Sequence, residues 1–511
     1  MRDLDADVIV VGAGPTGLML AGELRLAGVS TIVVERLAEP MRESRALGFS
    51  ARTIEEFDQR GLLPRFGELQ TIPIGHFGGL SIDYRVLEGG SYGARGIPQS
   101  RTAAILADWA TGLGAEVRRR HELTGLDAGD AGVELDLATP DGPRRLRAKY
   151  VVGCDGARST VRACAGIDFP GTEPVIEMWL ADVAGPRLRP RFSGERVPGG
   201  MVMVLPLGPD VNRVVVYERA AEPRADRTAP SFPEVAAAWE RLTGEDVHDG
   251  KPLWVSSFTD SSRLAAEYRR GRLLVAGDAA HVHMPIGAQG MSGGVQDAVN
   301  LGWKLAAEIH GHAPPGLLDT YHAERHPVGA RVVANTLAQR LLYLGGDDME
   351  PVRDVFAELL EYEAVRRHLV GMVTGLDIRY DVGPGDHPLL GRRVPDRKLV
   401  GAFTEPGRSP VGGRPPTPPG TNRTSIFECL HAGRGVVLDL AGDDAVGAAA
   451  TPWSDRVDVV SAAIHPVGAG DPLAAADAVL VRPDGHAAWV AAAGSGPDGL
   501  TDALARWFGP C

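Results

Sequence analysis

The chain has 511 residues, of which 44% are hydrophobic and 23% charged, and its formal net charge is −13. This length exceeds what one hydrophobic core supports, so two or three domains are expected. The acidic balance and the lack of a basic stripe argue against a nucleic-acid partner, and no uncharged apolar run is long enough for a membrane span. The acidic start leads into a β-branched run and does not resemble a signal peptide, which predicts a cytoplasmic location.

The first element is a β-branched run followed by closely spaced glycines. Residues 7–11 predict a buried parallel strand, and Gly12, Gly14 and Gly17 follow with the spacing of a dinucleotide-binding turn. Gly12 permits the tight turn, Gly14 lets the backbone approach a pyrophosphate, and Gly17 lets a helix pack close to the strand. That helix, predicted over 18–24, directs free N–H groups and the positive end of its dipole at the phosphates.

A second strand is predicted over 31–34 and ends in Glu35. This acid lies about 20 residues past the glycines, where an acceptor for a ribose hydroxyl is expected. Glu35 would repel a 2′-phosphate, although Arg36 stands beside it. The turn, the helix and the acid therefore predict a dinucleotide site without choosing among NAD, NADP and FAD.

The four cysteines are Cys154, Cys164, Cys429 and Cys511, and none forms a Cys-x-x-Cys pair. A structural zinc site is therefore not expected, and a redox-active disulfide beside a flavin is excluded. Cys154 is interpreted as a small buried residue.

Two later motifs narrow the cofactor. Residues 153–159 read Gly-Cys-Asp-Gly-Ala-Arg-Ser after one strand, and residues 277–281 read Gly-Asp-Ala-Ala-His after another. Together with the first turn, in this order, they resemble the class A FAD-dependent aromatic hydroxylases, which share the p-hydroxybenzoate hydroxylase fold. In that family the Asp-Gly motif touches FAD and the visiting nicotinamide, and the Gly-Asp motif binds the ribityl chain and pyrophosphate. Segment 285–291 precedes a helix, predicted over 295–305, whose N-terminus faces the flavin pyrimidine ring.

Within the family, the segments 43–49, 51–53 and 76–80 resemble the oxygenases that tailor aromatic polyketides, and the angucycline hydroxylases most of all. The resemblance implies that Arg45 lies beside the isoalloxazine and that Gln99 contacts the ribityl chain. The full set of cofactor contacts that it implies is Gly12, Gly14, Pro15, Thr16, Gly17, Glu35, Arg36, Arg45, Gln99, Asp155, Gly277, Asp278, Pro285, Gly287, Gly290 and Met291.

Between the second and third motifs lies a strand-rich insert. Strands are predicted over 178–183, 200–205 and 212–217, and an amphipathic helix over 233–242. In the family this insert is the sheet that roofs the substrate pocket. Substrate contacts are assigned to Met203, Arg213 and Tyr217 of this insert, and to Leu47 and Phe77 of the segments 43–49 and 76–80. A surface position is the alternative for Arg213, and core packing is the alternative for the others.

After Pro327 a helical region is predicted over 328–375, and Pro/Gly-rich stretches at 406–410 and 413–420 are typical of a linker or surface loop. The tail alternates short strands and helices and resembles the thioredoxin-like C-terminal domain of larger family members. A packing or homodimer-forming role is expected for it. The predicted fold class is α/β: an FAD-binding Rossmann-like domain over 1–172 and 262–395, the latter with the helical region, a β-sheet substrate domain over 173–261, and a thioredoxin-like domain over 396–511.

The resemblance implies an FAD-dependent monooxygenase that uses NADPH or NADH and dioxygen. A flavin C4a-hydroperoxide would hydroxylate a polycyclic aromatic polyketide of the angucycline kind. The single dinucleotide fingerprint indicates that the reductant visits and leaves. The sequence names no catalytic base. Baeyer–Villiger insertion, epoxidation, or a dehydration or quinone-forming step on the same scaffold stays open, as does a protein that binds FAD or polyketide without turnover.

Overall fold

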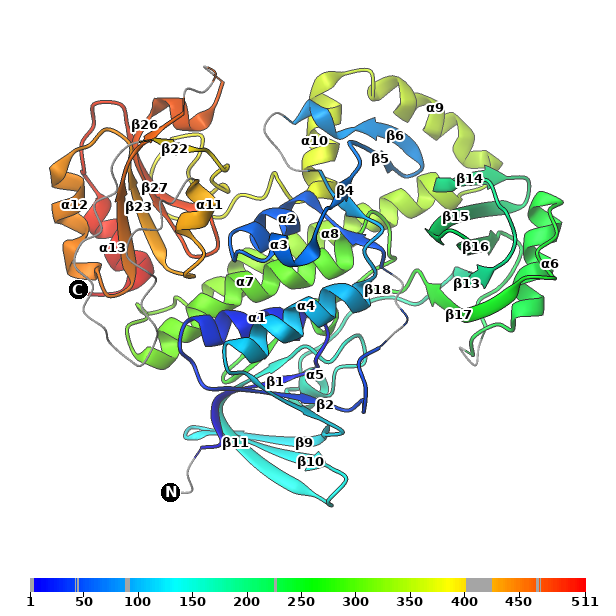
Figure 1. The fold of residues 1–511 in the computed structure, drawn as a ribbon, viewed down its shortest axis with the longest axis horizontal. Helices are drawn as coiled ribbons and strands as arrows, with labels where there is room; N and C mark the ends of the chain where they lie inside the picture. Colours follow the sequence, from blue (N-terminus) through cyan, green and yellow to red (C-terminus); the bar gives the residue numbers. More distant parts are fainter. Residues whose placement is uncertain are drawn as a thin grey trace.

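The computed structural model describes residues 4–41, 43, 46–87, 92–224, 228–400, 425–465, 468 and 470–511. Figure 1 shows a central α/β part, with one β-sheet on the right and a separate α/β domain containing the C-terminus on the left. The predicted fold class is confirmed, and the numerical domain boundaries given above remain predictions. None of the described helices combines the length and the apolar character needed to cross a membrane.

The central part is built on an eight-stranded sheet whose middle strand is β1. The β1 strand pairs in parallel with β2 on one side and β11 on the other, so that Val10 lies between Val33 and Val152. All three valines are fully buried, as expected for a sheet covered on both faces. The sheet contains β1 (Ala6–Val11), β2 (Thr31–Glu35), β8 (Glu116–Arg119), β9 (Glu122–Gly129), β10 (Gly132–Ala138), β11 (Arg144–Gly153), β19 (Arg269–Arg270) and β20 (Leu273–Val275).

Helices α1 and α7 pack against each other at very short range. A Cβ added at Gly302 of α7 would lie 2.5 Å from Cβ of Glu23, and one added at Gly22 of α1 would overlap the Trp109 ring of α4. Glycine at these two places therefore allows the close approach. The principal helices of the central part are α1 (Pro15–Leu26), α2 (Ala51–Asp58), α3 (Leu63–Phe66), α4 (Gln99–Gly112), α5 (Thr160–Cys164), α7 (Gln289–His310), α8 (Thr320–Leu344), α9 (Glu350–Leu359) and α10 (Glu363–Thr374).

Two of these helices begin earlier than the sequence predicted. The α7 helix starts six residues before Val295, and α8 starts at Thr320 and contains Pro327. A proline inside a helix loses one backbone hydrogen bond. Tyr321 and Arg325, on the turns that precede the proline, are buried and hold the first part of α8 in place. Tertiary packing therefore outweighs the local preference.

A five-stranded antiparallel sheet, here called the roof, forms the right-hand part of Figure 1. Its strands are β13 (Glu177–Ala184), β14 (Arg191–Val197), β15 (Gly200–Gly208), β16 (Val211–Glu218) and β17 (Lys251–Thr259), in the order β14-β15-β16-β13-β17. Helix α6 (Phe232–Thr243) covers the outer face, where Trp239 is completely buried among valines of the strands. The sequence predicted β13, β15, β16 and α6 but missed the two edge strands.

The chain enters and leaves the roof side by side. Strand β12 (Gly171–Thr172) pairs antiparallel with β18 (Ser262–Leu264), and β18 pairs in turn with β21 (His281–Val282). A side chain at Gly171 would overlap the Ser262 carbonyl oxygen, so glycine is needed for this close pairing.

Three short antiparallel strands and a hairpin lie before α4, the first of the strands preceding α2 and the rest following α3. They are β3 (Gly48–Phe49), β4 (Gln70–Thr71), β7 (Ala94–Arg95) and the hairpin β5 (Ile74–Phe77) with β6 (Leu80–Asp83). Phe77 of the hairpin stacks on Phe356 of α9 with ring centroids 5.5 Å apart.

The C-terminal domain has a four-stranded sheet in the order β24-β23-β26-β27. Its first two strands, β23 (Gly435–Asp439) and β24 (Val457–Ser461), are parallel, and β26 (Ala476–Val481) and β27 (Ala487–Ala492) are antiparallel additions. This is the thioredoxin-like topology that was predicted, with α12 (Asp444–Ala450) and α13 (Leu500–Phe508) beside the sheet and α11 (Ile426–Cys429) before it. The remaining pair is β22 (Leu399–Val400) with β25 (Ala463–Ile464). The predicted linker at 406–420 lies outside the described residues.

Candidate functional site

The glycine turn after β1 meets the second motif directly. Gly12 has φ of +106°, and a side chain there would overlap the carbonyl oxygen of Cys154. Gly17 packs equally closely on Gly12, whereas a Cβ at Gly14 would have no atom within 4 Å. Gly14 precedes α1, which begins with Pro15, and no side chain caps the helix. The turn therefore has one open position, at the end of a helix whose first N–H groups lack side-chain partners.

Glu35 closes the other side of this turn. Its Oε2 accepts a hydrogen bond from the Ala13 N–H at 2.8 Å, and its Oε1 accepts one from the Leu37 N–H at 2.8 Å. The carboxylate is thus fixed beside the glycines by two backbone amides. Arg36 is exposed to solvent next to it.

The second motif is organised around Asp155. Its Oδ2 accepts hydrogen bonds from the Thr160 and Val161 N–H groups at 2.7 and 3.1 Å, at the start of α5. Its Oδ1 is buried and has no hydrogen-bond partner among the described residues. Burial raises the pKa of the neighbouring Cys154 thiol well above its usual value, so this thiol is not nucleophilic at neutral pH.

The third motif packs on the first. At Gly277 an added Cβ would lie 2.7 Å from Thr16 Oγ1, and a side chain at Gly294 of α7 would overlap the same hydroxyl. Thr16 therefore lies against both glycines, and three segments distant in sequence converge here. Asp278 is exposed at this place.

A fully buried carboxylate on α7 holds the third motif. Asp297 accepts hydrogen bonds from the Gly277 N–H at 3.0 Å, from His281 Nε2 at 2.7 Å and from Arg325 Nε at 2.7 Å. Burial alone would raise the pKa of Asp297, but Arg325 and His281 lower it to about 2. The carboxylate therefore stays ionised and fixes the Gly277 backbone.

The Ser292 side chain fixes the loop before α7 through two hydrogen bonds. Ala288 has φ of +56° and is followed by the first turn of the helix, with Gly287 at +71° before it. The Ser292 hydroxyl donates to the Ala288 carbonyl at 2.9 Å and accepts from the Ser50 N–H at 2.9 Å. The Ser292 side chain is thus engaged within the protein. Pro285 and Gly287 are exposed, and Gly290 and Met291 are half-buried.

His283 lies over this first turn. Its ring is within 3.7 Å of a Cβ placed at Gly290, and its Nδ1 donates to the Met284 carbonyl at 2.9 Å. Burial lowers the pKa of His283 to about 4, so the ring is neutral at pH 7.

Of two other predicted cofactor residues, the structure describes Gln99 but not Arg45. Gln99 is the first residue of α4. Its N–H donates to the Ala46 carbonyl at 3.1 Å, just before strand β3. Arg45 lies outside the described residues.

The inner face of the roof is apolar and meets the loop before α7. One cluster there joins residues of the roof, the loop and the end of α8: Met178, Leu180, Met201, Val215, Tyr217, Met284, Ile286, Tyr343 and Leu344. Met203 packs against this cluster and is half-buried. The structure therefore brings Met203 and Tyr217 to the Pro285 loop. Phe77 belongs to a separate cluster with α9 and α10, and Leu47 is half-buried beside β7.

Arg213 is on the same roof face, but its side chain forms an ion pair within the roof. It pairs with Asp182 across β16 and β13, and it is 3% exposed. The surface position considered from the sequence is wrong, because the guanidinium is buried beside the Trp254 ring at 5.2 Å.

Comparison with known proteins agrees with this geometry. The family profile described as FAD binding domain matches residues 5–336, and the one described as aromatic-ring hydroxylase, C-terminal, matches residues 387–511. A 12-dehydrotetracycline 5-monooxygenase/anhydrotetracycline 6-monooxygenase of Streptomyces rimosus is 45% identical, with 99% of each chain covered. The crystal structure of CabE, an aromatic hydroxylase from angucycline biosynthesis, is 55% identical, with a TM-score of 0.92 over 99% of this chain and 100% of that one.

The chain belongs to the FAD-dependent aromatic-ring hydroxylases. It is a flavin-dependent aromatic monooxygenase by this membership. A Diels–Alderase from the biosynthetic pathway of pyrroindomycins is also similar, at 38% identity and a TM-score of 0.83 over 99% of each chain.

The residues present fit the FAD of an aromatic-ring hydroxylase. The space at Gly14 lies at an uncapped helix N-terminus, which suits a pyrophosphate. The N-terminus of α7 also has no side-chain cap, which suits the electron-rich edge of a flavin. Glu35 lies beside the first turn, and Asp278 is an exposed carboxylate of the third motif.

Sequence reasoning assigned no role to Asp297 or Arg325, although both lie in segments that carry the hydroxylase resemblance. The available signal was polar spacing along one helix, since Asp297, Asn300 and Lys304 recur at helical intervals and all three are buried in α7.

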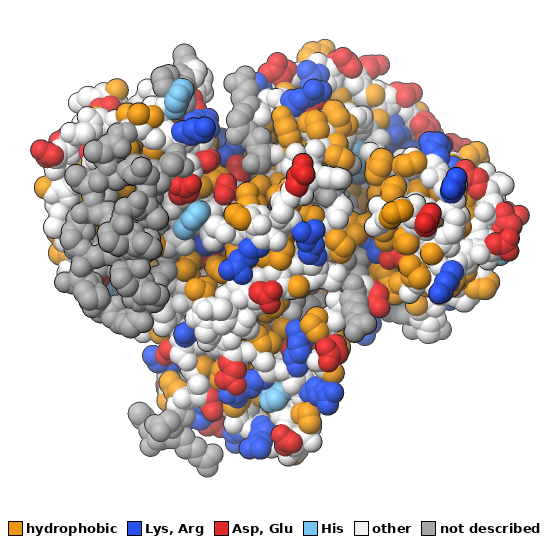
Figure 2. Space-filling model, in the orientation of Figure 1, with side chains coloured by type: hydrophobic (Ala, Val, Ile, Leu, Met, Phe, Trp, Pro, Cys, Tyr) orange, Lys and Arg blue, Asp and Glu red, His pale blue; other side chains and the backbone are white. Residues whose placement is uncertain are grey.

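A cavity of about 260 Å³ opens on the opposite side of α7, between that helix, α8 and the segment 372–381. Gln289, Gly293 and Gln296 of α7 line it, whereas Gly294 turns toward Thr16. His281 of the third motif and Ser292 at the start of α7 also line this cavity. In Figure 2 acidic and basic side chains are interspersed over the face shown.

Proposed function

We propose that this hydroxylase acts on a polycyclic aromatic polyketide of the angucycline or anhydrotetracycline kind, using NADPH or NADH and dioxygen. The observation that carries the proposal is the apolar inner face of the roof, which lies against the Pro285 loop. Methionine side chains are unbranched and adaptable, and with Tyr217 they suit a flat multi-ring ligand. The likeness to monooxygenases of tetracycline and angucycline biosynthesis supports the same substrate class.

The charge of the roof supports a substrate without a carboxylate. Arg213 is the charged residue among the predicted substrate contacts, and its guanidinium is already paired with the Asp182 carboxylate. A small aromatic acid needs a cation available for its carboxylate, since burying an unpaired carboxylate is costly.

The proposal assigns parts of FAD to most of the predicted cofactor residues. The first turn and α1 bind the pyrophosphate, with Glu35 on the ribose and Asp278 and Gln99 on the ribityl chain. Backbone N–H groups of Gly290 and Met291 would hold the flavin pyrimidine ring, and the family resemblance assigns Arg45, which is outside the described residues, to the isoalloxazine. When bound, FAD supplies oxygen activation through the C4a-hydroperoxide expected from the family resemblance. The protein orients the ring carbon and excludes water.

The test is flavin reduction by NADPH in stopped flow. A tricyclic or tetracyclic phenolic polyketide should accelerate it, and p-hydroxybenzoate should not. Product mass then reports the added oxygen, and NMR separates hydroxylation from Baeyer–Villiger insertion, which has the same mass change. Stimulation by p-hydroxybenzoate alone would refute the substrate class.

A second candidate is a cyclisation or rearrangement without net oxygen transfer, favoured by the likeness to a Diels–Alderase. It predicts product formation without consumption of NADPH or dioxygen. The oxygen electrode distinguishes it from hydroxylation in one experiment. A cytoplasmic location and a homodimer remain predictions of the sequence.

A further inference from the structure

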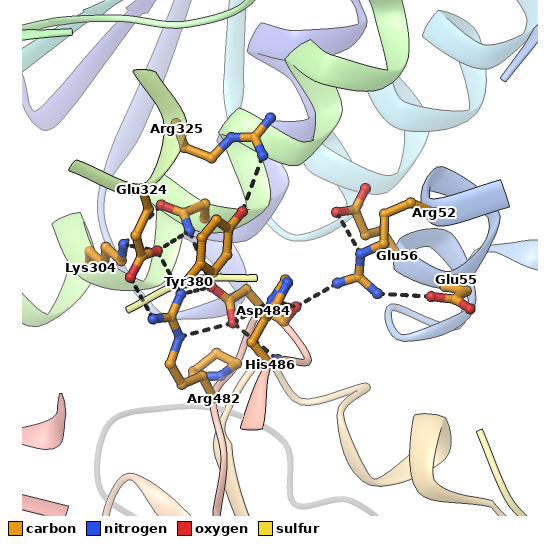
Figure 3. Close-up of polar contacts among 12 residues, drawn as sticks. Arg52, Glu55, Glu56, Lys304, Glu324, Arg325, Tyr380, Arg482, Asp484 and His486 are labelled. Carbon is orange, nitrogen blue, oxygen red and sulfur yellow. Dashed lines mark hydrogen bonds and ion pairs between the residues drawn. The ribbon is translucent and has the colours of Figure 1, made fainter. Parts of the chain in front are cut away.

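We propose that Arg482 of the C-terminal domain is a positioning residue for the FAD-binding segment at Gly277. The proposal rests on FAD being the cofactor, as in the proposed function. Arg482 lies at the end of β26, far along the chain from the three motifs. Figure 3 shows the first part of the route, in which Arg482 pairs with Glu324 and Tyr380 contacts Arg325. Arg325 and Asp297 complete the route to Gly277.

The path begins at the C-terminal domain. The Arg482 guanidinium donates to both carboxylate oxygens of Glu324, with NH1–Oε1 2.6 Å and NH2–Oε2 2.8 Å. The Arg482 side chain is 0% exposed and lies 4.5 Å from the centre of the Trp507 ring, which restricts its position. It also pairs with Asp484 of its own domain. Because Glu324 belongs to α8, this pair crosses from the C-terminal domain to the central part.

The second step is along α8. Glu324 and Arg325 are consecutive, so a shift of this helix turn that moves one carboxylate moves the neighbouring guanidinium as well. Tyr380 provides a second link, between Arg325 and Arg482. Its hydroxyl accepts a hydrogen bond from Arg325 Nη1 at 3.1 Å, and its ring centre lies 5.3 Å from the Arg482 guanidinium. Arg325 then donates to Asp297, whose other oxygen accepts the Gly277 N–H.

The charges explain why the path responds to Arg482. Lys304 Nζ lies 2.8 Å from Glu324 Oε2, and Asn300 donates to the same oxygen. Without Arg482, Glu324 would keep Lys304 as a cationic partner. Asp484 would lose its guanidinium partner and keep its contacts with His486 and Asn300. Two carboxylates would then share one cation in a buried interface. Such a state is relieved by admitting water or moving α8, and either change displaces Arg325.

The experiment uses full-length protein and measures FAD affinity by titrating FAD into the apoprotein. Arg482→Met removes the charge and keeps an apolar side chain. Arg434→Met is the matched control, since Arg434 pairs with Asp458 within the C-terminal domain and is 23% exposed. We expect Arg482→Met to raise Kd for FAD about 3- to 30-fold and the control to leave it unchanged. Arg482→Lys should recover part of the affinity.

A double variant identifies the route. In Glu324→Gln the carboxylate that needs Arg482 is gone, so adding Arg482→Met should raise Kd less than it does in the parent protein. Hydrogen exchange of the apoprotein peptide containing Gly277 should be faster in Arg482→Met than in the control. If Arg482→Met does not fold, the comparison of Glu324→Gln with the double variant still measures the FAD effect.

Three results would overturn the proposal: unchanged FAD affinity in a folded Arg482→Met, full additivity in the double variant, or unchanged exchange at Gly277. Failure of the parent protein itself to bind FAD would instead refute the proposed function, so the two failures are distinguishable.

Discussion

Arg213 and Asp182 are direct cross-strand partners in the roof and form a bidentate ion pair, with Nε–Oδ1 2.7 Å and NH2–Oδ2 2.8 Å. The Arg213 side chain is 4% exposed and the Asp182 side chain 13%. The roof therefore carries an internal, neutralised charge pair on the face that was expected to meet substrate.

Removing one member of this pair should destabilise the protein. Arg213→Met should lower the free energy of unfolding by about 3 kcal/mol, because it leaves Asp182 largely buried without its partner. The double variant Asp182→Asn with Arg213→Met should recover part of the loss. Urea denaturation measures both. A normal unfolding curve together with a large rise in KM for polyketide would show that Arg213 contacts substrate instead.

Gly14→Ala should separate cofactor binding from folding. The backbone has φ of −79°, and none of the described residues beyond its chain neighbours has an atom within 4 Å of the new Cβ, so the fold should tolerate the change. The methyl group would occupy the space assigned to the pyrophosphate, and FAD affinity should fall at least about tenfold. Gly112→Ala is the control, since its Cβ also meets no neighbouring atom. Equal FAD affinity in the two variants would refute the assignment.

Asp278→Ala should weaken FAD binding while leaving the thermal stability of the apoprotein nearly unchanged. A hydrogen bond from a ribityl hydroxyl to a carboxylate contributes about 1.5–3 kcal/mol, or roughly ten- to a hundredfold in Kd. Fluorescence titration of FAD measures the change. Asp141→Ala, at an exposed turn before β11, is the control. Retained affinity in Asp278→Ala would contradict a contact with FAD.

Glu56→Gln should change the pH dependence of stability. Burial raises the pKa of Glu56 to about 8, although Arg52 and Arg325 oppose the shift, and Oε2 has no hydrogen-bond partner among the described residues. Since the folded pKa lies above the unfolded value, stability is fully present below about pH 4.5 and is lost toward pH 8. This loss amounts to at most about 1.4 kcal/mol per pH unit.

The glutamine variant lacks this slope, so it should match the parent protein near pH 5 and exceed its stability near pH 9. Denaturation midpoints at the two pH values test this. A variant that is less stable than the parent protein at both pH 5 and pH 9 would contradict this prediction. It would mean that Glu56 is ionised and stabilises Arg52.

The FAD cradle was predictable because its glycines act locally. Gly17 packs on the Gly12 carbonyl within one strand–turn–helix, whereas Gly12 itself meets Cys154 of the second motif. The spacing of these glycines and the order of the three motifs pointed to the family. Asp297 was not predictable in the same way. Its partners come from 20 residues before it and 28 residues after it, and nothing in their spacing shows that they meet.

The roof was predicted only where hydrophobic residues dominate. Strand β14 is largely polar and contains Gly194, and β17 begins with Lys251 and Pro252, so neither resembles a strand until its neighbour is known. The burial of Arg213 likewise depends on Asp182 being opposite it, which the strand register decides.

The pairing of β12 with β18 makes the roof an insertion with adjoining ends. Gly171 is opposite Arg263, and Thr172 opposite Ser262, so the 90 or so residues between them leave and rejoin the central part at one point. The parallel strands β11 and β20 are neighbours regardless of what is inserted between them. The roof can therefore be exchanged for the corresponding insert of a relative. Chimeras joined at this neck should retain the flavin-binding sheet and acquire the ring-system preference of whichever relative donates the insert.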